Sequence, residues 1–234
     1  MLSHEYKCIF VHIPKVAGIS IEQVFLDALG LDFARRESLL LGIVNRGDRG
    51  PGILSHLTAR EYVEYGYVNQ ETFDAYFKFA FVRNPYDRVY SFYKYLGYAR
   101  LVSFETFILD ELPRLFGDPS LHYFIKPMSS YVYDESGTRL VDYVGKLETI
   151  NEDFAQVARR LNLGGARLQN LNDSSGMSSG THAVRAWRII KKHPGIVFRL
   201  SFRPAAKEKR YTGEMKNAVQ KYYEPDFVHF EYAR

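Results

Sequence analysis

Cys8-Ile-Phe-Val-His-Ile-Pro-Lys-Val-Ala-Gly-Ile-Ser-Ile-Glu22 is the stretch that says most about the fold of this chain. The apolar, β-branched run from Cys8 to Ile13 predicts a buried strand. Pro14 ends this strand because it has no N–H to donate, and Gly18 permits a tight backbone path before a helix. The apolar positions of that helix recur with helical spacing at Ile21, Val24, Phe25, Ala28 and Leu29. The stretch therefore predicts a strand, a tight loop and a helix.

The loop between this strand and this helix has the features of an anion-binding cradle. A helix N-terminus directs backbone N–H groups and the positive end of its dipole at an anion. The predicted phosphate-binding residues are Lys15, Val16, Ala17, Gly18, Ile19 and Ser20, of which Lys15 adds charge and Ser20 a hydroxyl. The loop is not a Walker A motif, in which the lysine follows the glycines. An ordinary turn with a surface lysine is the alternative interpretation.

Length and composition favour a single α/β domain over residues 1–234. The net charge of +4 and the pI near 9.0 favour anionic partners but are too small to require nucleic acid. The single cysteine, Cys8, excludes an internal disulfide and favours a reducing compartment. Residues 1–7 lack the apolar core of a signal peptide, and no apolar run has the length of a membrane helix. We therefore expect a cytoplasmic protein without a membrane partner.

A second anion-binding element follows the next clear strand, Phe77–Val82. Arg83 ends this strand, and Asn84 and Pro85 have the residue types of an N-cap and a first helical position. That helix is predicted to bury Val89, Phe92, Tyr93 and Leu96 and to leave Arg88, Ser91 and Tyr95 on another side. Arg83 and Ser91 could therefore bind a second phosphate.

The remaining pattern predicts further helices and strands. Helices are expected over Phe104–Leu115, from Asn151 onward, and around Glu214–Tyr223. The segment Tyr131–Val144 predicts a hairpin or strand pair about a turn, and Gly195–Leu200 predicts a strand.

Three motifs in this order carry a resemblance to a known family: His12–Ser20, Phe81–Ser91 and Tyr143–Phe154, joined by the closing segment Tyr222–Tyr232. Together they resemble the carbohydrate-type sulfotransferases, the branch with heparan, dermatan and chondroitin enzymes and many bacterial members. The resemblance implies an α/β, P-loop-like three-layer fold with a central, mainly parallel sheet flanked by helices. In such open sheets, ligands bind outside the carboxyl ends of the strands.

The resemblance also implies a donor, 3′-phosphoadenosine 5′-phosphosulfate, whose product is adenosine 3′,5′-bisphosphate. It assigns the first loop to the 5′-phosphosulfate and the pair Arg83 and Ser91 to the 3′-phosphate. Arg210, with Arg203 and Lys209 in the same C-terminal segment, could also reach the 3′-phosphate. The chain departs from the pattern at Val16 and Ile19, where the family commonly has threonines. Two hydroxyls that could contact phosphate are therefore replaced by alkyl groups, which leaves Ser20 and the backbone N–H groups.

The implied reaction is in-line attack of an acceptor hydroxyl on sulfur, which requires a base and positive charge near the leaving phosphate. Lys15 is the candidate for the charge. His56 is the candidate base, since an imidazole accepts a proton near neutral pH, and it resembles a histidine that precedes a helix in the uronyl 2-O-sulfotransferase branch. The rival bases are Glu61, a capping residue, and Glu37 and Asp48 in the long loop over residues 35–55. His12 is expected to orient the cradle and not to react.

Two other classes of function stay open from the sequence. One is a nucleotide-dependent phosphotransferase, and the other is a non-catalytic protein that binds adenosine bisphosphate or nucleic acid. The favoured acceptor is a hydroxyl of a carbohydrate or small molecule, although lipids and peptide tyrosines are alternatives. No nucleic-acid partner is expected, because an aromatic-basic reading motif is missing. No metal is expected, because the histidines lack the spacing of metal ligands, and the oligomeric state is left open.

Overall fold

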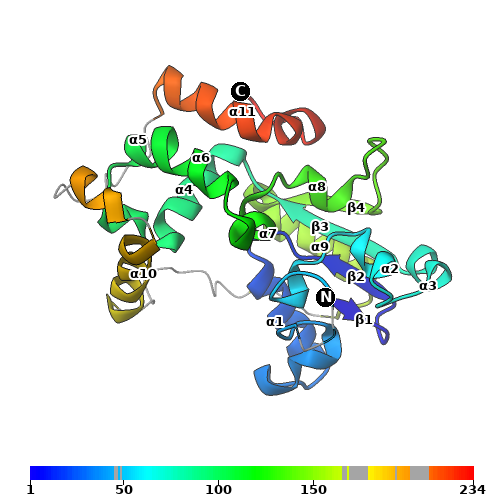
Figure 1. Ribbon diagram of the computed structural model, residues 1–234. Helices are drawn as coiled ribbons and strands as arrows, with labels where there is room; N and C mark the ends of the chain where they lie inside the picture. Colours follow the sequence, from blue (N-terminus) through cyan, green and yellow to red (C-terminus); the bar gives the residue numbers. More distant parts are fainter. Residues whose placement is uncertain (45–46, 48, 165–167, 169–178, 193, 201–210) are drawn as a thin grey trace. The chain divides into compact units, whose positions relative to one another are not determined.

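The computed structural model divides the chain into two compact units, each with its own packed interior (Figure 1). One comprises Met1–Arg83 and Lys126–Asn172, and the other comprises Asn84–Ile125 and Asp173–Arg234. The structure describes residues 1–44, 47, 49–164, 168, 179–192, 194–200 and 211–234. A single domain over the whole chain stays a prediction, and the two units are described separately below.

The first unit is built on an open sheet of four strands in the order β1 (Leu2–Ser3), β2 (Cys8–Val11), β3 (Phe77–Val82) and β4 (Tyr143–Lys146). β1 pairs antiparallel with β2, whereas β2, β3 and β4 are parallel to one another. Every residue of β2 is buried, as the continuous apolar run predicts for a strand covered on both faces. The protein is therefore mixed α/β, with an open sheet flanked by helices (Figure 1).

The helical segments of this unit lie between and after the strands. They are α1 (Gly18–Ala28), η1 (Phe33–Leu39), η2 (Leu54–His56), α2 (Glu61–Glu64), α3 (Gln70–Ala75), α8 (Ser129–Val132), η6 (Leu147–Thr149) and α9 (Ile150–Arg160). α1 begins at the predicted glycine and buries Ile21, Val24 and Phe25, which confirms its predicted inner face. Ala28 is exposed, however, and Leu26 is buried. The buried face of α1 therefore differs from the predicted one near the end of the helix.

The predicted hairpin over Tyr131–Val144 is wrong in its main part. Tyr131 and Val132 end a helix, α8, and a single bridge joins Tyr133 to Arg139. The predicted turn is present, because the Asp134 carboxylate accepts the N–H groups of Ser136 and Thr138. The second predicted strand forms only at Tyr143–Lys146. It pairs in parallel with β3 and not with a preceding hairpin strand.

The regular elements of the second unit, among its described residues, are all helical. Its segments are α4 (Pro85–Leu96), η3 (Tyr98–Arg100), α5 (Phe104–Thr106), the π-helical η4 (Phe107–Glu111), α6 (Leu112–Phe116), η5 (Pro119–Leu121), α7 (His122–Ile125), α10 (Ser179–Lys192), η8 (Pro194–Arg199) and α11 (Gly213–His229). Asn84 caps α4 as predicted, since its side chain accepts the Tyr86 N–H at 3.0 Å. Phe92, Phe107 and Val219 are among the fully buried residues of its core.

Two expectations for this unit are wrong. Gly195–Leu200 is not a strand but lies largely in a 3₁₀ helix, in which Ile196 is buried and Phe198 is 94% exposed. One-sided burial suits a helical turn better than a fully covered strand, and Pro194 favours the first turn of a helix. Arg88, predicted to lie on another side of α4 than the buried face, is fully buried. Its guanidinium lies 4.9 Å from the Phe92 ring centroid and donates to the Phe124 carbonyl. The core of this unit therefore buries more of the surface of α4 than its apolar residues alone.

Candidate functional site

The carboxyl ends of three parallel strands place three cations at one edge of the sheet. β2 and β3 are in register at Val11 and Ala80, and β3 and β4 are in register at Val82 and Lys146. Lys15 follows β2 by four residues, Arg83 follows β3 directly, and Lys146 is the last residue of β4. This edge is where open α/β sheets bind ligands. The structure thus brings the predicted residues Lys15 and Arg83 to a common edge and adds Lys146, which the sequence analysis did not single out.

The cradle loop has an unusual backbone. Lys15 has φ of +71° and Ala17 has φ of +65°, so two residues without glycine's freedom adopt the left-handed region. Left-handed residues in such a loop direct successive N–H groups into one concavity that suits an anion. Intrahelical bonding begins with the Ser20 N–H, which donates to Ala17, so the N–H groups of Gly18 and Ile19 lie ahead of it. The loop therefore presents donors at the start of α1.

The electrostatics of this helix start also favour an anion. Ala17, its N-cap, supplies no side-chain cap, and the first turn of α1 carries no acidic residue. An anion at this position would meet the positive end of the helix dipole without an acidic residue in the same turn. The 11 residues of α1 are long enough for that dipole to develop.

The side chains of the cradle divide into buried and exposed ones. Val16 is fully buried and Ser20 is 4% exposed, whereas Ile19 is 58% exposed and Lys15 is partly exposed. The Val16 side chain thus belongs to the core, and only its backbone can serve the cradle.

Gly18 is required by a close approach of His12 to the helix start. A Cβ added at Gly18 would lie 2.0 Å from Nε2 of His12, far inside van der Waals contact. His12 itself follows β2 and is 5% exposed. The contact fits the expectation that His12 orients the cradle, because its ring rests on the first residue of α1.

Glu22, on the second turn of α1, is the partner of His12. Its Oε1 atom lies 2.5 Å from His12 Nδ1, and its side chain is 14% exposed. Burial by itself would raise the pKa of Glu22, but the charge and hydrogen bond of His12 outweigh burial and leave that pKa lowered. Glu22 is therefore a carboxylate at neutral pH. Sequence reasoning missed it, although its position four residues after Gly18 places both on one helix face.

His56 is the last residue of η2 and makes two contacts with His12, a hydrogen bond to its backbone and a ring–ring contact. Its Nδ1 lies 3.0 Å from the backbone oxygen of His12, and the two rings meet edge to face at 4.7 Å. A carbonyl oxygen only accepts, so Nδ1 of His56 carries the proton and Nε2 keeps its lone pair. Burial first and then the charge of His12 lower the pKa of His56 to about 3. His56 is therefore a neutral imidazole with an available acceptor nitrogen.

The rival bases have other surroundings. Glu61 Oε2 accepts the Thr58 N–H at 2.7 Å and its Oε1 accepts the Tyr65 hydroxyl at 3.1 Å, so its carboxylate serves the turn that opens α2. Glu37 is exposed on η1, and Asp48 lies outside the described residues.

The predicted 3′-phosphate residues are distributed over both units. Arg83 is partly buried after β3 in the first unit. Ser91 is partly exposed in the second turn of α4, in the second unit. Arg203, Lys209 and Arg210 lie outside the described residues.

The segment after β4 is held by one carboxylate. Asp153 accepts the Lys146 N–H at 2.7 Å, the Thr149 hydroxyl at 2.7 Å and the Tyr143 hydroxyl at 2.8 Å. Burial would raise the pKa of Asp153, but these hydrogen bonds outweigh it and leave the pKa lowered. Asp153 thus fixes where the chain leaves the sheet edge at Lys146.

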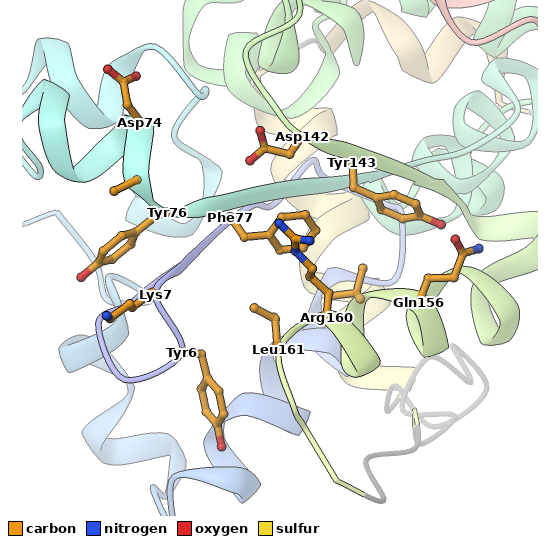
Figure 2. Close-up of a pocket in the computed structure, with 12 residues that line it drawn as sticks. Tyr6, Lys7, Asp74, Tyr76, Phe77, Asp142, Tyr143, Gln156, Arg160 and Leu161 are labelled. Atoms are coloured by element: carbon orange, nitrogen blue, oxygen red, sulfur yellow. The ribbon is translucent and has the colours of Figure 1, made fainter.

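A hollow of about 650 Å³ lies at the opposite edge of the sheet, where β3 and β4 begin (Figure 2). Figure 2 shows Arg160 lying across Phe77, and their separation is 5.6 Å from guanidinium carbon to ring centroid. Asp142, at its rim, is 3.1 Å from Lys78 Nζ and accepts the Lys78 N–H. None of the predicted site residues that the structure describes lines this hollow. The hollow therefore lies at one edge of the sheet, and the residues with the predicted chemistry lie at the other. We assign the candidate site to the carboxyl edge, where the strained loop and the histidines lie.

Comparison with known proteins gives one match. A model of the sulfotransferase family matches residues 1–233, nearly the entire chain. No curated protein matches the chain, and no solved structure does. Among the described residues, no helix combines the length and the apolar character needed to cross a membrane.

Proposed function

The chain belongs to the carbohydrate-type sulfotransferase family, and from this premise we propose that it transfers a sulfuryl group from 3′-phosphoadenosine 5′-phosphosulfate to a hydroxyl group. The observation that carries the proposal is the loop with two left-handed residues, Lys15 and Ala17, at the uncapped start of α1. Such a loop suits a phosphate or phosphosulfate group.

The residues present fit the donor's 5′ end. The N–H groups of residues 16–19, the Ser20 hydroxyl and the Lys15 ammonium supply donors and positive charge, and the first turn of α1 carries no acidic residue. Gly18 has no Cβ, and the His12 ring takes that space behind the cradle. We assign the 3′-phosphate to Arg83 and Ser91, with Arg210 as a further contact.

The chemistry proposed for this chain's residues is charge stabilisation and proton transfer. When bound, the donor supplies a sulfuryl group whose bond to phosphate oxygen breaks as the acceptor oxygen bonds to sulfur, leaving adenosine 3′,5′-bisphosphate. Lys15 and the N–H groups of the cradle hold the charge that grows on the leaving oxygen. His56 accepts the proton of the acceptor hydroxyl at Nε2.

His56 is favoured as the base by its hydrogen bond to His12. That bond leaves Nε2 as the acceptor nitrogen, whereas both oxygens of Glu61 accept hydrogen bonds from its own turn. Without a bound donor, the low pKa of His56 makes it a weak base. An anion bound in the cradle would raise that pKa, because a nearby negative charge favours the protonated imidazole. Donor binding therefore prepares His56 for its role.

We propose a carbohydrate or small molecule as the acceptor and the cytoplasm as the compartment. The compartment is supported by Cys8, a lone thiol buried in β2 whose pKa is raised to about 12 by burial. Such a thiol is unreactive, and its survival without a disulfide partner suits a reducing environment.

Calorimetric titration of adenosine 3′,5′-bisphosphate into the wild type, Lys15→Ala and Arg83→Ala tests the donor site. We expect the wild type to bind and each variant to lose about tenfold or more in affinity, since a charge-assisted hydrogen bond contributes about 1.5–3 kcal/mol. Lys7→Ala, which removes an exposed cation before β2, is the matched control and should bind as the wild type does.

The same titration separates the alternatives. Failure of the wild type to bind would overturn the proposed donor, and tighter binding of ATP with magnesium would favour a phosphotransferase. Steep salt-dependent binding of DNA or RNA would favour a nucleic-acid binder. Binding without transfer of labelled sulfuryl to any hydroxyl acceptor would leave a non-catalytic adenosine bisphosphate binder.

A further inference from the structure

His12 joins three parts of the candidate site that are distant in sequence. Its ring rests against Gly18 at the start of α1, its Nδ1 is 2.5 Å from Glu22, and its backbone oxygen is 3.0 Å from His56 Nδ1. His56 is 44 residues away from His12 in sequence. One residue therefore links the cradle to the candidate base.

Glu22 is the group that sets the orientation of His12. A histidine ring can turn about its side-chain bonds, and two ring nitrogens can each carry the proton. A carboxylate 2.5 Å from Nδ1 accepts a hydrogen bond from that nitrogen, which selects one ring orientation of His12 and keeps a proton on Nδ1. Both side chains are largely withdrawn from solvent, so water cannot readily substitute for the carboxylate.

The orientation of His12 matters for His56 through two contacts. The rings of His12 and His56 pack edge to face with centroids 4.7 Å apart, and the His12 carbonyl accepts the His56 Nδ1–H. The bond from His56 Nδ1 goes to the backbone of His12, which the His12 ring does not move, so the ring acts through the packing contact. Movement of the His12 ring would leave space beside the His56 ring, which would then be free to turn away from the His12 carbonyl and lose the bond that selects its tautomer. The carboxylate of Glu22 thus acts on His56 without touching it.

We propose that Glu22 is a positioning residue that, through His12, holds His56 in the tautomer with a proton on Nδ1 and a lone pair on Nε2. This inference rests on the proposed function for its catalytic meaning, since only that tautomer can take a proton at Nε2. It assigns a role to a side chain that contacts neither the cradle backbone nor the candidate base.

Long-range proton–nitrogen NMR correlation of the histidine rings tests this inference near neutral pH without any donor or acceptor. The protein is labelled with nitrogen-15, and the His56 signals are assigned from a His56→Asn sample. We expect the wild type to show His56 with a protonated Nδ1 and an unprotonated Nε2. Glu22→Met keeps the volume but removes the acceptor, and should shift His56 toward the mixture of tautomers that free imidazole shows.

Two further variants complete the design. Glu22→Gln retains an acceptor oxygen for His12 Nδ1 and should restore much of the wild-type tautomer. Gln23→Met introduces the same methionine one residue along α1, where the native side chain bonds to Asp27, and should leave His56 unchanged.

Two outcomes of the NMR experiment would overturn the inference. A wild-type His56 with its proton on Nε2 contradicts it without any variant, even if Glu22→Met does not fold. An unchanged His56 tautomer in folded Glu22→Met contradicts it as well. Because no step uses a nucleotide, a failed titration of adenosine 3′,5′-bisphosphate would overturn the proposed function and leave this result standing.

Discussion

Individual residues of the candidate site adopt states that an isolated peptide would avoid. Lys15 and Ala17 are left-handed, at a cost of about 1–2 kcal/mol each. The burial of Val16 between them and the contact of His12 with Gly18 hold the loop in this conformation. Strain of this kind concentrates at functional sites, which agrees with an anion-binding role for the loop.

The pKa of His56 predicts how stability depends on pH. Its pKa is about 3 in the folded protein and 6.5 in the unfolded chain, so below pH 6.5 the unfolded chain binds a proton that the folded protein does not. The free energy of unfolding must therefore fall as the pH drops from about 6.5 toward 3. Glu22 adds to the loss only below about pH 4.5, because its folded pKa is lowered. The groups that act on His56 are His12, Glu22 and the α-amino group of Met1.

We predict that His56→Asn, which cannot titrate, loses less stability than the wild type between about pH 7.5 and pH 5. Urea unfolding at the two pH values measures the difference. His4→Asn, at an exposed histidine of the same unit, is the control and should keep the wild-type pH dependence. Equal losses in the wild type and His56→Asn would show that His56 is protonated in the folded protein.

At the scale of elements, the position of each chain segment at the carboxyl edge depends on a few polar bonds. Asp153 accepts three of them at the junction of β4 and α9, and these join a strand residue, a connecting turn and a helix. Asp134 also accepts several bonds, but all within one turn that it shares with Ser136 and Thr138. The two aspartates therefore differ mainly in what they connect.

We predict that Asp153→Ala lowers the free energy of unfolding by about 2 kcal/mol, because partly buried donors lose a charged acceptor. Asp134→Ala should cost distinctly less, since its donors face solvent. Urea denaturation of both variants at neutral pH measures the contrast. A smaller effect at Asp153 than at Asp134 would contradict a bracing role for the β4–α9 junction.

At the scale of the whole molecule, the parallel strands separate two edges of different character. The carboxyl edge carries Lys15, Arg83 and Lys146 beside the strained loop. The amino edge carries the hollow with Arg160 across Phe77. Parallel order is responsible for this separation, because it brings all three strand ends to one side.

We predict that Lys146→Ala weakens the binding of adenosine 3′,5′-bisphosphate several-fold and that Arg160→Ala leaves it unchanged. Both variants remove one positive charge from the same unit, so a difference between them reflects position and not net charge. Calorimetric titration at low and at physiological salt measures the effect, which should shrink as salt screens the charge. Equal weakening by both variants would contradict a donor site at the carboxyl edge.

Local pattern determined much of this protein. The apolar run of β2, the glycine that starts α1 and the cap formed by Asn84 were all predicted, because each depends on neighbours within a few residues. The motif order also indicated the family and pointed to Lys15 and Arg83 at strand ends.

Tertiary structure decided the rest, because it depends on contacts between distant residues. The pairing of β4 with β3, the burial of Arg88 and the bond from His56 to His12 arise from packing that no local pattern encodes. Glu22 is the clearest case: in sequence it is a polar residue on an amphipathic helix, and only the folded chain places His12 against it. The sequence by itself therefore determined the elements and the residue types of the site, and the tertiary structure decided which of them act together.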